Sequence, residues 1–230
     1  SISNWTDVIP HEKGRPLTNL SVFENYYAVS YRALGLPKIK VYNISTGDAH
    51  DISPLDEDYD MYVIEDTEWS SDILRYGYSS LGRPHCIFDY DMSTRTQILR
   101  KQTQVLGDFS QSDYITERRY ATAKDHTQIP ISLVYRKDII PSPETPLYLY
   151  GYGSYGINVE SEFSSSRLSL LDRGFIFAIA HIRGGTNLGR HWYDDGKLLN
   201  KRNTFTDFIS VAEHLTSIGY TSPCKLIASG

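Results

Sequence analysis

The sequence has few cysteines and no long hydrophobic run. Its two cysteines, Cys86 and Cys224, are far apart in 230 residues. They form neither a metal-binding motif nor a disulfide framework, which fits a reducing, cytoplasmic setting. The longest apolar run, residues 175–180, has six residues and is too short for a transmembrane helix. The sequence therefore predicts a protein without membrane spans, and no metal or cofactor.

The sequence also has no excess of basic residues. The formal net charge is −5 and the pI is about 5.8, so neither a nucleic-acid partner nor a polybasic membrane anchor is indicated. Hydrophobic residues make up 40% and charged residues 22%, which excludes disordered, collagen-like and coiled-coil classes. The length suffices for one large domain or two small ones.

The first hundred residues are rich in β-forming residues and contain a weak repeat. Residues 31–37 (Tyr-Arg-Ala-Leu-Gly-Leu-Pro) and 78–84 (Tyr-Ser-Ser-Leu-Gly-Arg-Pro) match at four positions, 47 residues apart. In each copy Leu-Gly-x-Pro is expected in a loop between two strands. This period is typical of propeller blades, although two similar hairpins in a sandwich are the alternative. Since two blades cannot close a ring, the propeller interpretation implies that other blades are missing.

From about residue 111 the pattern changes to alternating strands and helices. Two strands are expected at 114–121 and 129–136, followed by an order strand, helix, strand, helix, strand between residues 147 and 229. Thr204 is predicted to cap the second helix, with Asp207 three residues later. This order predicts a parallel sheet covered on both faces. The acidic run 56–60 lacks the spacing of a calcium loop and is predicted to be a solvated turn.

The densest candidate motif is Tyr150-Gly-Tyr-Gly-Ser-Tyr-Gly156, directly after a predicted strand. Ser154 is not expected to be a nucleophile, because Tyr152 stands where a nucleophile elbow needs glycine and no Gly-x-Ser-x-Gly occurs in the chain. The loop is better suited to supply oxyanion-hole donors. A phosphate cradle and a plain tight turn are the alternatives.

Two further sites are less specific. Arg183 follows the predicted strand 175–182 and could bind a ligand or lock neighbouring loops together. Glu160 and Glu162 are two residues apart, and in an extended segment they would face the same side and attract a cation.

Taken together, these motifs resemble the prolyl oligopeptidase family of serine peptidases, and within it the oligopeptidase B branch. The matching stretches include 150–156, 166–174, 182–185, 192–193, 195–197 and 203–207. The resemblance implies an α/β-hydrolase domain, here its incomplete N-terminal part at 111–230, preceded by the last two blades of a seven-bladed β-propeller at 1–110. We therefore expect an internal fragment that ends just before the catalytic serine, with the rest of its polypeptide as its missing partner.

The resemblance assigns roles to four residues. Tyr152 matches the tyrosine whose hydroxyl helps to form the oxyanion hole, and Tyr155 matches an aromatic residue near the S1 pocket. Glu160 and Glu162 match an acidic pair that favours a basic residue at P2, although the branch has Asp where this chain has Glu. Arg183 remains a candidate substrate-binding residue.

The activity implied is hydrolysis of short peptides after Arg or Lys, through an acyl-enzyme and a Ser-Asp-His triad beyond this chain. Gly230 would be the first glycine of the serine elbow, so the 230-residue chain alone is expected to be inactive. The alternatives are prolyl or acylaminoacyl specificity, or a catalytically silent piece.

Overall fold

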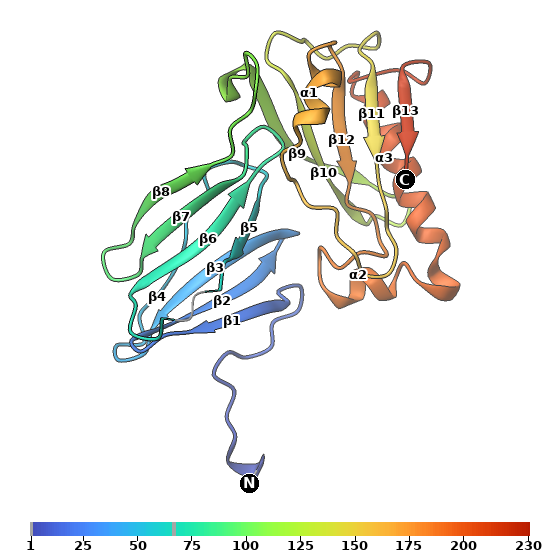
Figure 1. Cartoon of the computed structure of the whole chain (residues 1–230). Coiled ribbons are helices and arrows are strands. Elements are labelled where there is room, and N and C mark those ends of the chain that lie inside the picture. Colours follow the sequence, from blue (N-terminus) through green and yellow to red (C-terminus); the bar gives the residue numbers. More distant parts are fainter. Residues whose placement is uncertain (1, 66–67) are drawn as a thin grey trace.

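The chain forms three β-sheets, seen side by side in Figure 1, in a computed structural model that describes residues 2–65 and 68–230. Two of the sheets come from the first half of the chain and have four strands each. The third sheet has five strands and carries the helices of the second half. The change in sequence pattern near residue 111 therefore coincides with a change of architecture.

The first two sheets are antiparallel, with their strands in chain order. The strands are β1 (Leu17–Val22), β2 (Tyr26–Ala33), β3 (Leu36–Asn43) and β4 (Ala49–Asp51), then β5 (Asp60–Val63), β6 (Ile73–Ser79), β7 (Cys86–Asp91) and β8 (Thr96–Gln102). The Leu-Gly pairs of the repeat lie between β2 and β3 and between β6 and β7, as predicted. Leu36 and Pro37 already belong to β3.

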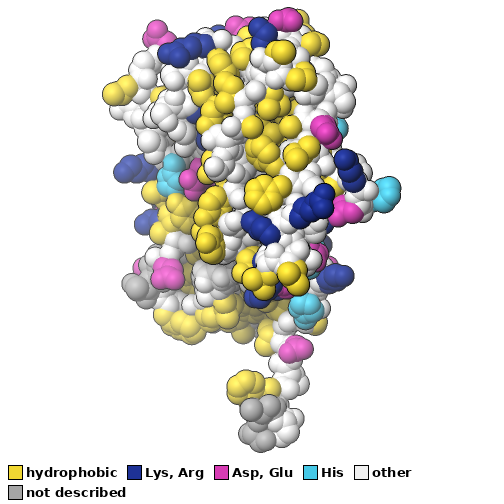
Figure 2. Space-filling model, turned by 90° about the vertical axis from the view of Figure 1, so that its right-hand side faces the viewer, with side chains coloured by type: hydrophobic (Ala, Val, Ile, Leu, Met, Phe, Trp, Pro, Cys, Tyr) yellow, Lys and Arg dark blue, Asp and Glu magenta, His cyan; other side chains and the backbone are white. Residues whose placement is uncertain are grey.

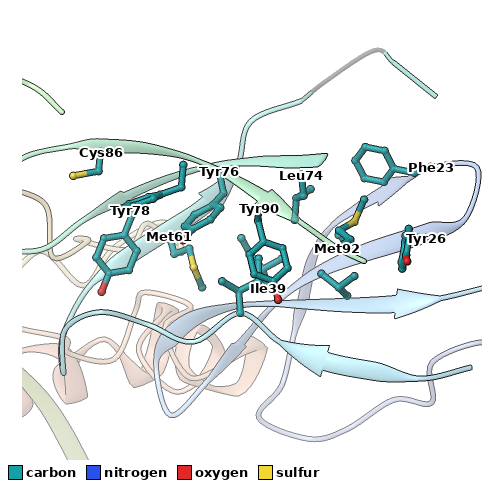
Figure 3. Packing of buried hydrophobic residues seen from close by; sticks show 14 of the residues in the cluster. Phe23, Tyr26, Ile39, Met61, Leu74, Tyr76, Tyr78, Cys86, Tyr90 and Met92 are labelled. Carbon is teal, nitrogen blue, oxygen red and sulfur yellow. The ribbon is translucent and has the colours of Figure 1, made fainter. Parts of the chain in front are cut away.

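One hydrophobic core joins these two sheets. Figure 3 shows Ile39 and Tyr26 of the first sheet facing Tyr76, Leu74 and other residues of the second. Tyr76 stacks on Phe88 at 5.3 Å between ring centroids. In β3, Ile39 and Val41 enter this core at alternate positions, whereas every residue of the outer strand β8 is exposed. Each sheet therefore buries one face against its neighbour, as repeats of this kind require.

The third sheet is mixed, in the order β13-β11-β12-β10-β9. Its strands are β9 (Tyr114–Thr122), β10 (Gln128–Arg136), β11 (Leu147–Tyr150), β12 (Ile176–Ala180) and β13 (Leu226–Ser229). The predicted parallel pairing holds for β11 with β12 and with β13. Strands β9 and β10 pair antiparallel, because the short turn between them cannot make a parallel crossover. Strand β10 also runs antiparallel to β12, so the sheet is not wholly parallel as predicted.

Two helices cover opposite faces of this sheet. Helix α1 (Ser165–Leu171) packs on Phe177 and Ile179 of β12, whereas α3 (Arg202–Ser217) packs on the intervening residues. Shorter pieces are η1 (Ile2–Asn4), η2 (Gln111–Asp113), α2 (Arg190–Asp194) and η3 (Leu198–Asn200). No helix in the described ranges has the length and apolar character needed to cross a bilayer.

The predicted cap of the last helix is wrong. Helix α3 begins at Arg202, so Thr204 lies inside its first turn. The Thr204 hydroxyl donates to the Arg183 carbonyl oxygen at 2.7 Å, and Asp207 also bonds Arg183. Both side chains therefore join α3 to the segment after β12 and do not close a capping box.

The acidic run 56–60 is not a solvated turn. Asp58 is fully buried and accepts a hydrogen bond from Arg118 Nη1 at 2.7 Å. Ser161 donates to the other Asp58 carboxylate oxygen at 2.9 Å, and Asp60 is 8% exposed. Asp58 is buried because its partners, Arg118 of β9 and Ser161, lie 60 and 103 positions later in the chain, and single-sequence patterns cannot report such distant partners.

The two Leu-Gly turns also contact the third sheet. Arg118 Nη2 donates to the Leu34 carbonyl oxygen at 3.1 Å, and Leu81 is buried in the cluster that contains Val134 and Leu171. The repeated turns therefore attach the first two sheets to the third.

Candidate active site

The candidate site lies where the three parallel strands end, at one edge of the third sheet (Figure 1). The Gly151 amide donates to the Ser229 carbonyl oxygen at 3.1 Å, so β11 and β13 leave the sheet side by side. A Cβ on Gly151 would lie 2.8 Å from the Phe208 ring. Glycine is therefore required there for the loop to pass over α3.

The glycine-rich loop after β11 is a tightly held structure. Gly153 and Gly156 have φ of +62° and +71°, and Tyr155 adopts the left-handed conformation at +56°. The Gly156 amide donates to the Gly184 carbonyl oxygen at 2.9 Å. A Cβ on Gly184 would lie 1.9 Å from the Gly153 carbonyl oxygen. The loop thus lies directly against the backbone that follows β12.

Tyr152 and Tyr155 face different cavities. Tyr152 is 38% exposed and lines a cavity of about 350 Å³ with Gly151, Phe208 and Gly230. Tyr155 is 83% exposed and lines a cavity of about 240 Å³ with Tyr193. The structure therefore brings Tyr152, and not Tyr155, to the end of β13.

The cavity beside Tyr152 opens on an apolar face. Figure 2 looks onto the side of the molecule where β13 and α3 lie, and hydrophobic side chains gather there in vertical bands. Phe205 and Ile209 of α3 line the cavity and are 62% and 52% exposed, and Ile227 of β13 is 46% exposed. An apolar wall beside a phenol suits a site from which water is excluded during reaction.

Arg183 is held by two carboxylates. Its guanidinium makes a two-pronged contact with Asp207, at 2.8 Å from Nε and 2.5 Å from Nη2, and Nη1 lies 2.7 Å from Asp125 Oδ2. The hydrogen bonds that Arg183 donates to Asp207 raise the pKa of Arg183 above its ordinary value. This placement favours locking neighbouring segments over binding a ligand, since the fork is already occupied.

Glu160 and Glu162 face the same region, as alternation predicted, and Ser161 between them is buried. Glu160 is paired with Arg32 of β2, with its two oxygens 2.9 and 2.8 Å from Nη1 and Nη2. Glu162 is exposed. One carboxylate of the pair is thus neutralised and the other faces solvent.

Asp60 makes this acidic pair a cluster of three. Burial raises the pKa of Asp60 to about 7, and the charges of Glu160 and Glu162 act in the same direction. Sequence reasoning missed Asp60, because the residue is a hundred positions away from the pair and lay in a run assigned to solvent. It also missed Arg32, which lies in the repeat 31–37 at a position where the two copies differ.

Lys201 is a further residue that the motifs did not indicate. Its ammonium lies 2.5 Å from the Gly153 carbonyl oxygen and 2.7 Å from Ser154 Oγ. Burial lowers the pKa of Lys201 below its usual value. The residue directly precedes α3 and reaches back across the glycine-rich loop.

Two family models match the chain. The model of the prolyl oligopeptidase N-terminal beta-propeller domain matches residues 1–103, and that of the prolyl oligopeptidase family matches residues 161–230. Among curated relatives, dipeptidyl aminopeptidase BI of Pseudoxanthomonas mexicana is 40% identical over the whole chain and protease 2 of Moraxella lacunata 34%. The chain covers 32% and 33% of these two proteins.

Solved structures agree with these matches. Oligopeptidase B from Leishmania major superposes with a TM-score of 0.90 at 37% identity, covering 98% of this chain and 33% of that one. Oligopeptidase B from Trypanosoma brucei with covalently bound antipain gives 0.89 at 38% identity, covering 96% and 32%. The chain spans about a third of the length of the relatives it matches. It belongs to the prolyl oligopeptidase family and joins the last blades of that family's β-propeller to the first part of its α/β-hydrolase domain.

Proposed function

We propose that this chain is part of a serine oligopeptidase that cleaves short peptides after Arg or Lys. The longer polypeptide, called the whole enzyme below, would supply a Ser-Asp-His triad and form an acyl-enzyme. The observation that carries the proposal is Tyr152, whose ring lines the cavity at the end of β13. A phenol there would donate to the developing oxyanion together with a backbone N–H.

We propose a domain boundary at residue 110, directly before η2 (Gln111–Asp113). Residues 1–110 would be the last two of seven blades, and 111–230 the first part of the catalytic domain, up to the nucleophile elbow. The share of the relatives' length that the chain spans supports a longer polypeptide. The two free cysteines fit a cytoplasmic location.

The preference for basic peptides is supported by the cluster of Asp60, Glu160 and Glu162. Glu160 is paired with Arg32, and Asp60, whose pKa is raised to about 7, carries only part of a negative charge at neutral pH. The exposed carboxylate of Glu162 is therefore the charge of the cluster that is most available to a substrate. A Lys or Arg side chain of a substrate would be attracted to this cluster. Tyr155 is proposed to flank the S1 pocket.

The test is a substrate profile of the whole enzyme. N-terminally blocked fluorogenic peptides ending in Arg, Lys or Pro are compared by kcat/KM, and each is offered with a basic or a neutral residue at P2. We expect Arg and Lys to be preferred at P1, and a serine-directed phosphonate to abolish turnover. Preference for Pro at P1 would contradict the proposal.

A second candidate is release of dipeptides from a free amino end, because the relative at 40% identity is named a dipeptidyl aminopeptidase. The same profile includes unblocked dipeptide substrates. Turnover of these, with none of the blocked peptides, would favour the second candidate. The purified 230-residue chain is expected to show no turnover of either kind, since its sequence contains no Gly-x-Ser-x-Gly elbow.

A further inference from the structure

We propose that Lys201 is a positioning residue that fixes the loop carrying Tyr152 in its active conformation. The inference rests on the proposed function and adds a residue to it. Lys201 Nζ contacts three oxygens: Gly153 O at 2.5 Å, Ser154 Oγ at 2.7 Å and Thr204 Oγ1 at 3.3 Å. The first two belong to the residues that directly follow Tyr152.

The Gly153 carbonyl needs a partner at this position. Gly153 is buried in the left-handed conformation, and a Cβ there would lie 2.5 Å from Thr204 Cγ2. Its carbonyl oxygen lies so close to Gly184 that a Cβ on Gly184 would be 1.9 Å away. A buried carbonyl without a donor is costly. The Thr204 hydroxyl donates to this oxygen at 3.4 Å, whereas the Lys201 ammonium supplies the shorter, charge-assisted bond and so holds the peptide next to Tyr152.

The place of Lys201 in its own helix also points to this role. Lys201 is the residue before the first turn of α3, in helical conformation with φ −56° and ψ −26°. A cation at a helix N-terminus is opposed by the helix dipole. Such an unfavourable placement of a charge is expected where a functional contact offsets its cost. Here the hydrogen bonds from Lys201 to Gly153 and Ser154 offset it.

The contacts favour a positioning role over a Ser154–Lys201 catalytic dyad. A lysine that acts as a base needs a free lone pair directed at the serine hydroxyl. Here Nζ donates to three oxygens, which uses all three protons of an ammonium group. Lys201 therefore acts through the loop and not on a substrate proton.

The test measures kcat and KM of the whole enzyme for Lys201→Met, Tyr152→Phe and the double variant. We expect Lys201→Met to lower kcat about tenfold or more, since small misplacements of catalytic groups carry costs of that order, and to leave KM nearly unchanged. In the Tyr152→Phe background the same substitution should have little further effect, because the group it positions has been removed.

Lys201→Arg keeps the charge and donors, so it should recover part of kcat and remain folded if Lys201→Met does not. Lys225→Met is the matched control. Lys225 directly precedes β13, at the end of that strand opposite Gly230, and its exposed ammonium pairs with Glu144 at 3.3 Å, so kcat should not change.

Three outcomes would overturn the inference. The first is wild-type kcat in both Lys201 variants, and the second is an equal loss from Lys201→Met in the wild-type and Tyr152→Phe backgrounds. The third is complete loss of turnover in Ser154→Ala, which would indicate a dyad. If Tyr152→Phe alone leaves kcat unchanged, Tyr152 is not an oxyanion-hole residue, and Lys201 then has no catalytic group to position. A Tyr152 effect without a Lys201 effect overturns the positioning role alone.

Discussion

At the scale of single residues, the phenol of Tyr152 is the chemical group that the proposed mechanism needs most. Tyr152→Phe in the whole enzyme removes one donor to the oxyanion and leaves the ring in place. We expect kcat to fall about 100-fold or more, with a smaller change in KM, because the hydroxyl acts in the transition state. Steady-state kinetics on the best peptide of the substrate profile measures this.

The matched control for Tyr152→Phe is Tyr148→Phe in β11, the strand that precedes the loop. The Tyr148 ring stacks on Phe177 at 5.8 Å on the α1 face of the sheet, away from the cavity. Removal of the Tyr148 hydroxyl should therefore leave kcat unchanged. An unchanged kcat in Tyr152→Phe would remove Tyr152 from the oxyanion hole.

Asp60 predicts a pH dependence of stability. Burial, then Glu160 and Glu162, raise the pKa of Asp60 from 3.8 to about 7 in the folded state. Between these values the folded chain holds a proton that the unfolded chain has lost, so this group's contribution to stability falls as pH rises from about 4 to 7. The slope is at most about 1.4 kcal/mol per pH unit.

Asp60→Asn removes this titration. The wild type should lose stability between pH 5 and pH 7, whereas the variant should lack this loss. The free energy of unfolding of the variant minus that of the wild type should therefore increase over this range and level off above pH 7. Denaturant unfolding at several pH values measures it. A difference that does not depend on pH would show that Asp60 titrates alike in both states.

At the scale of elements, Arg183 ties the end of β12 to α3 and to the turn between β9 and β10. Arg183→Met would leave the carboxylate of Asp207, which is 0% exposed, buried without its cation. We expect a loss of about 3–5 kcal/mol in the free energy of unfolding, as for other broken buried pairs. Arg183→Lys should give an intermediate loss, because lysine cannot form the two-pronged contact.

Denaturant unfolding compares these variants with Arg190→Met. Arg190 is exposed and pairs with Asp194 one turn away, so its replacement should change stability little. If Arg183 bound substrate instead, Arg183→Met would raise KM and leave stability unchanged.

The elements themselves were largely predictable, because local patterns determine them. The copies of the repeat place their Leu-Gly pairs in corresponding turns, and β11, β12 and β13 pair in parallel as the alternation of strands and helices indicated. Thr204 was misassigned because its hydroxyl serves a carbonyl on another segment. A capping pattern cannot distinguish a bond within the helix from a bond to a neighbour.

At the scale of the whole molecule, a buried ion pair joins the first two sheets to the third. The side chains of Arg118 and Asp58 are 4% and 0% exposed. Arg118→Met or Asp58→Leu alone leaves one buried charge, so we expect each to cost about 3–5 kcal/mol. The double variant should cost less than the sum, since no uncompensated charge remains.

Equilibrium unfolding of the two single variants and the double variant in one background gives the coupling energy directly. Additive losses would mean that the pair contributes nothing as a pair. The sequence could not anticipate this contact, because the two residues are 60 positions apart and each alone resembles an ordinary surface charge. The local glycine-rich motif indicated Tyr152 as a candidate, and its role in an oxyanion hole stays a prediction. The contacts of Lys201, Arg32 and Asp60 are made with residues distant in the sequence, so no local pattern could indicate them.

The strand order of the third sheet also determines when, during folding, the candidate site can form. Strand β11 has β12 on one side, but its other neighbour, β13, comes from more than seventy residues later in the chain. The amide of Gly151 finds its acceptor, Ser229, only when β13 docks. During synthesis from the N-terminus, both four-stranded sheets and most of the third are therefore made before the glycine-rich loop is fixed. The loop that carries Tyr152 therefore reaches its final position only after β13 has been made and has paired with β11.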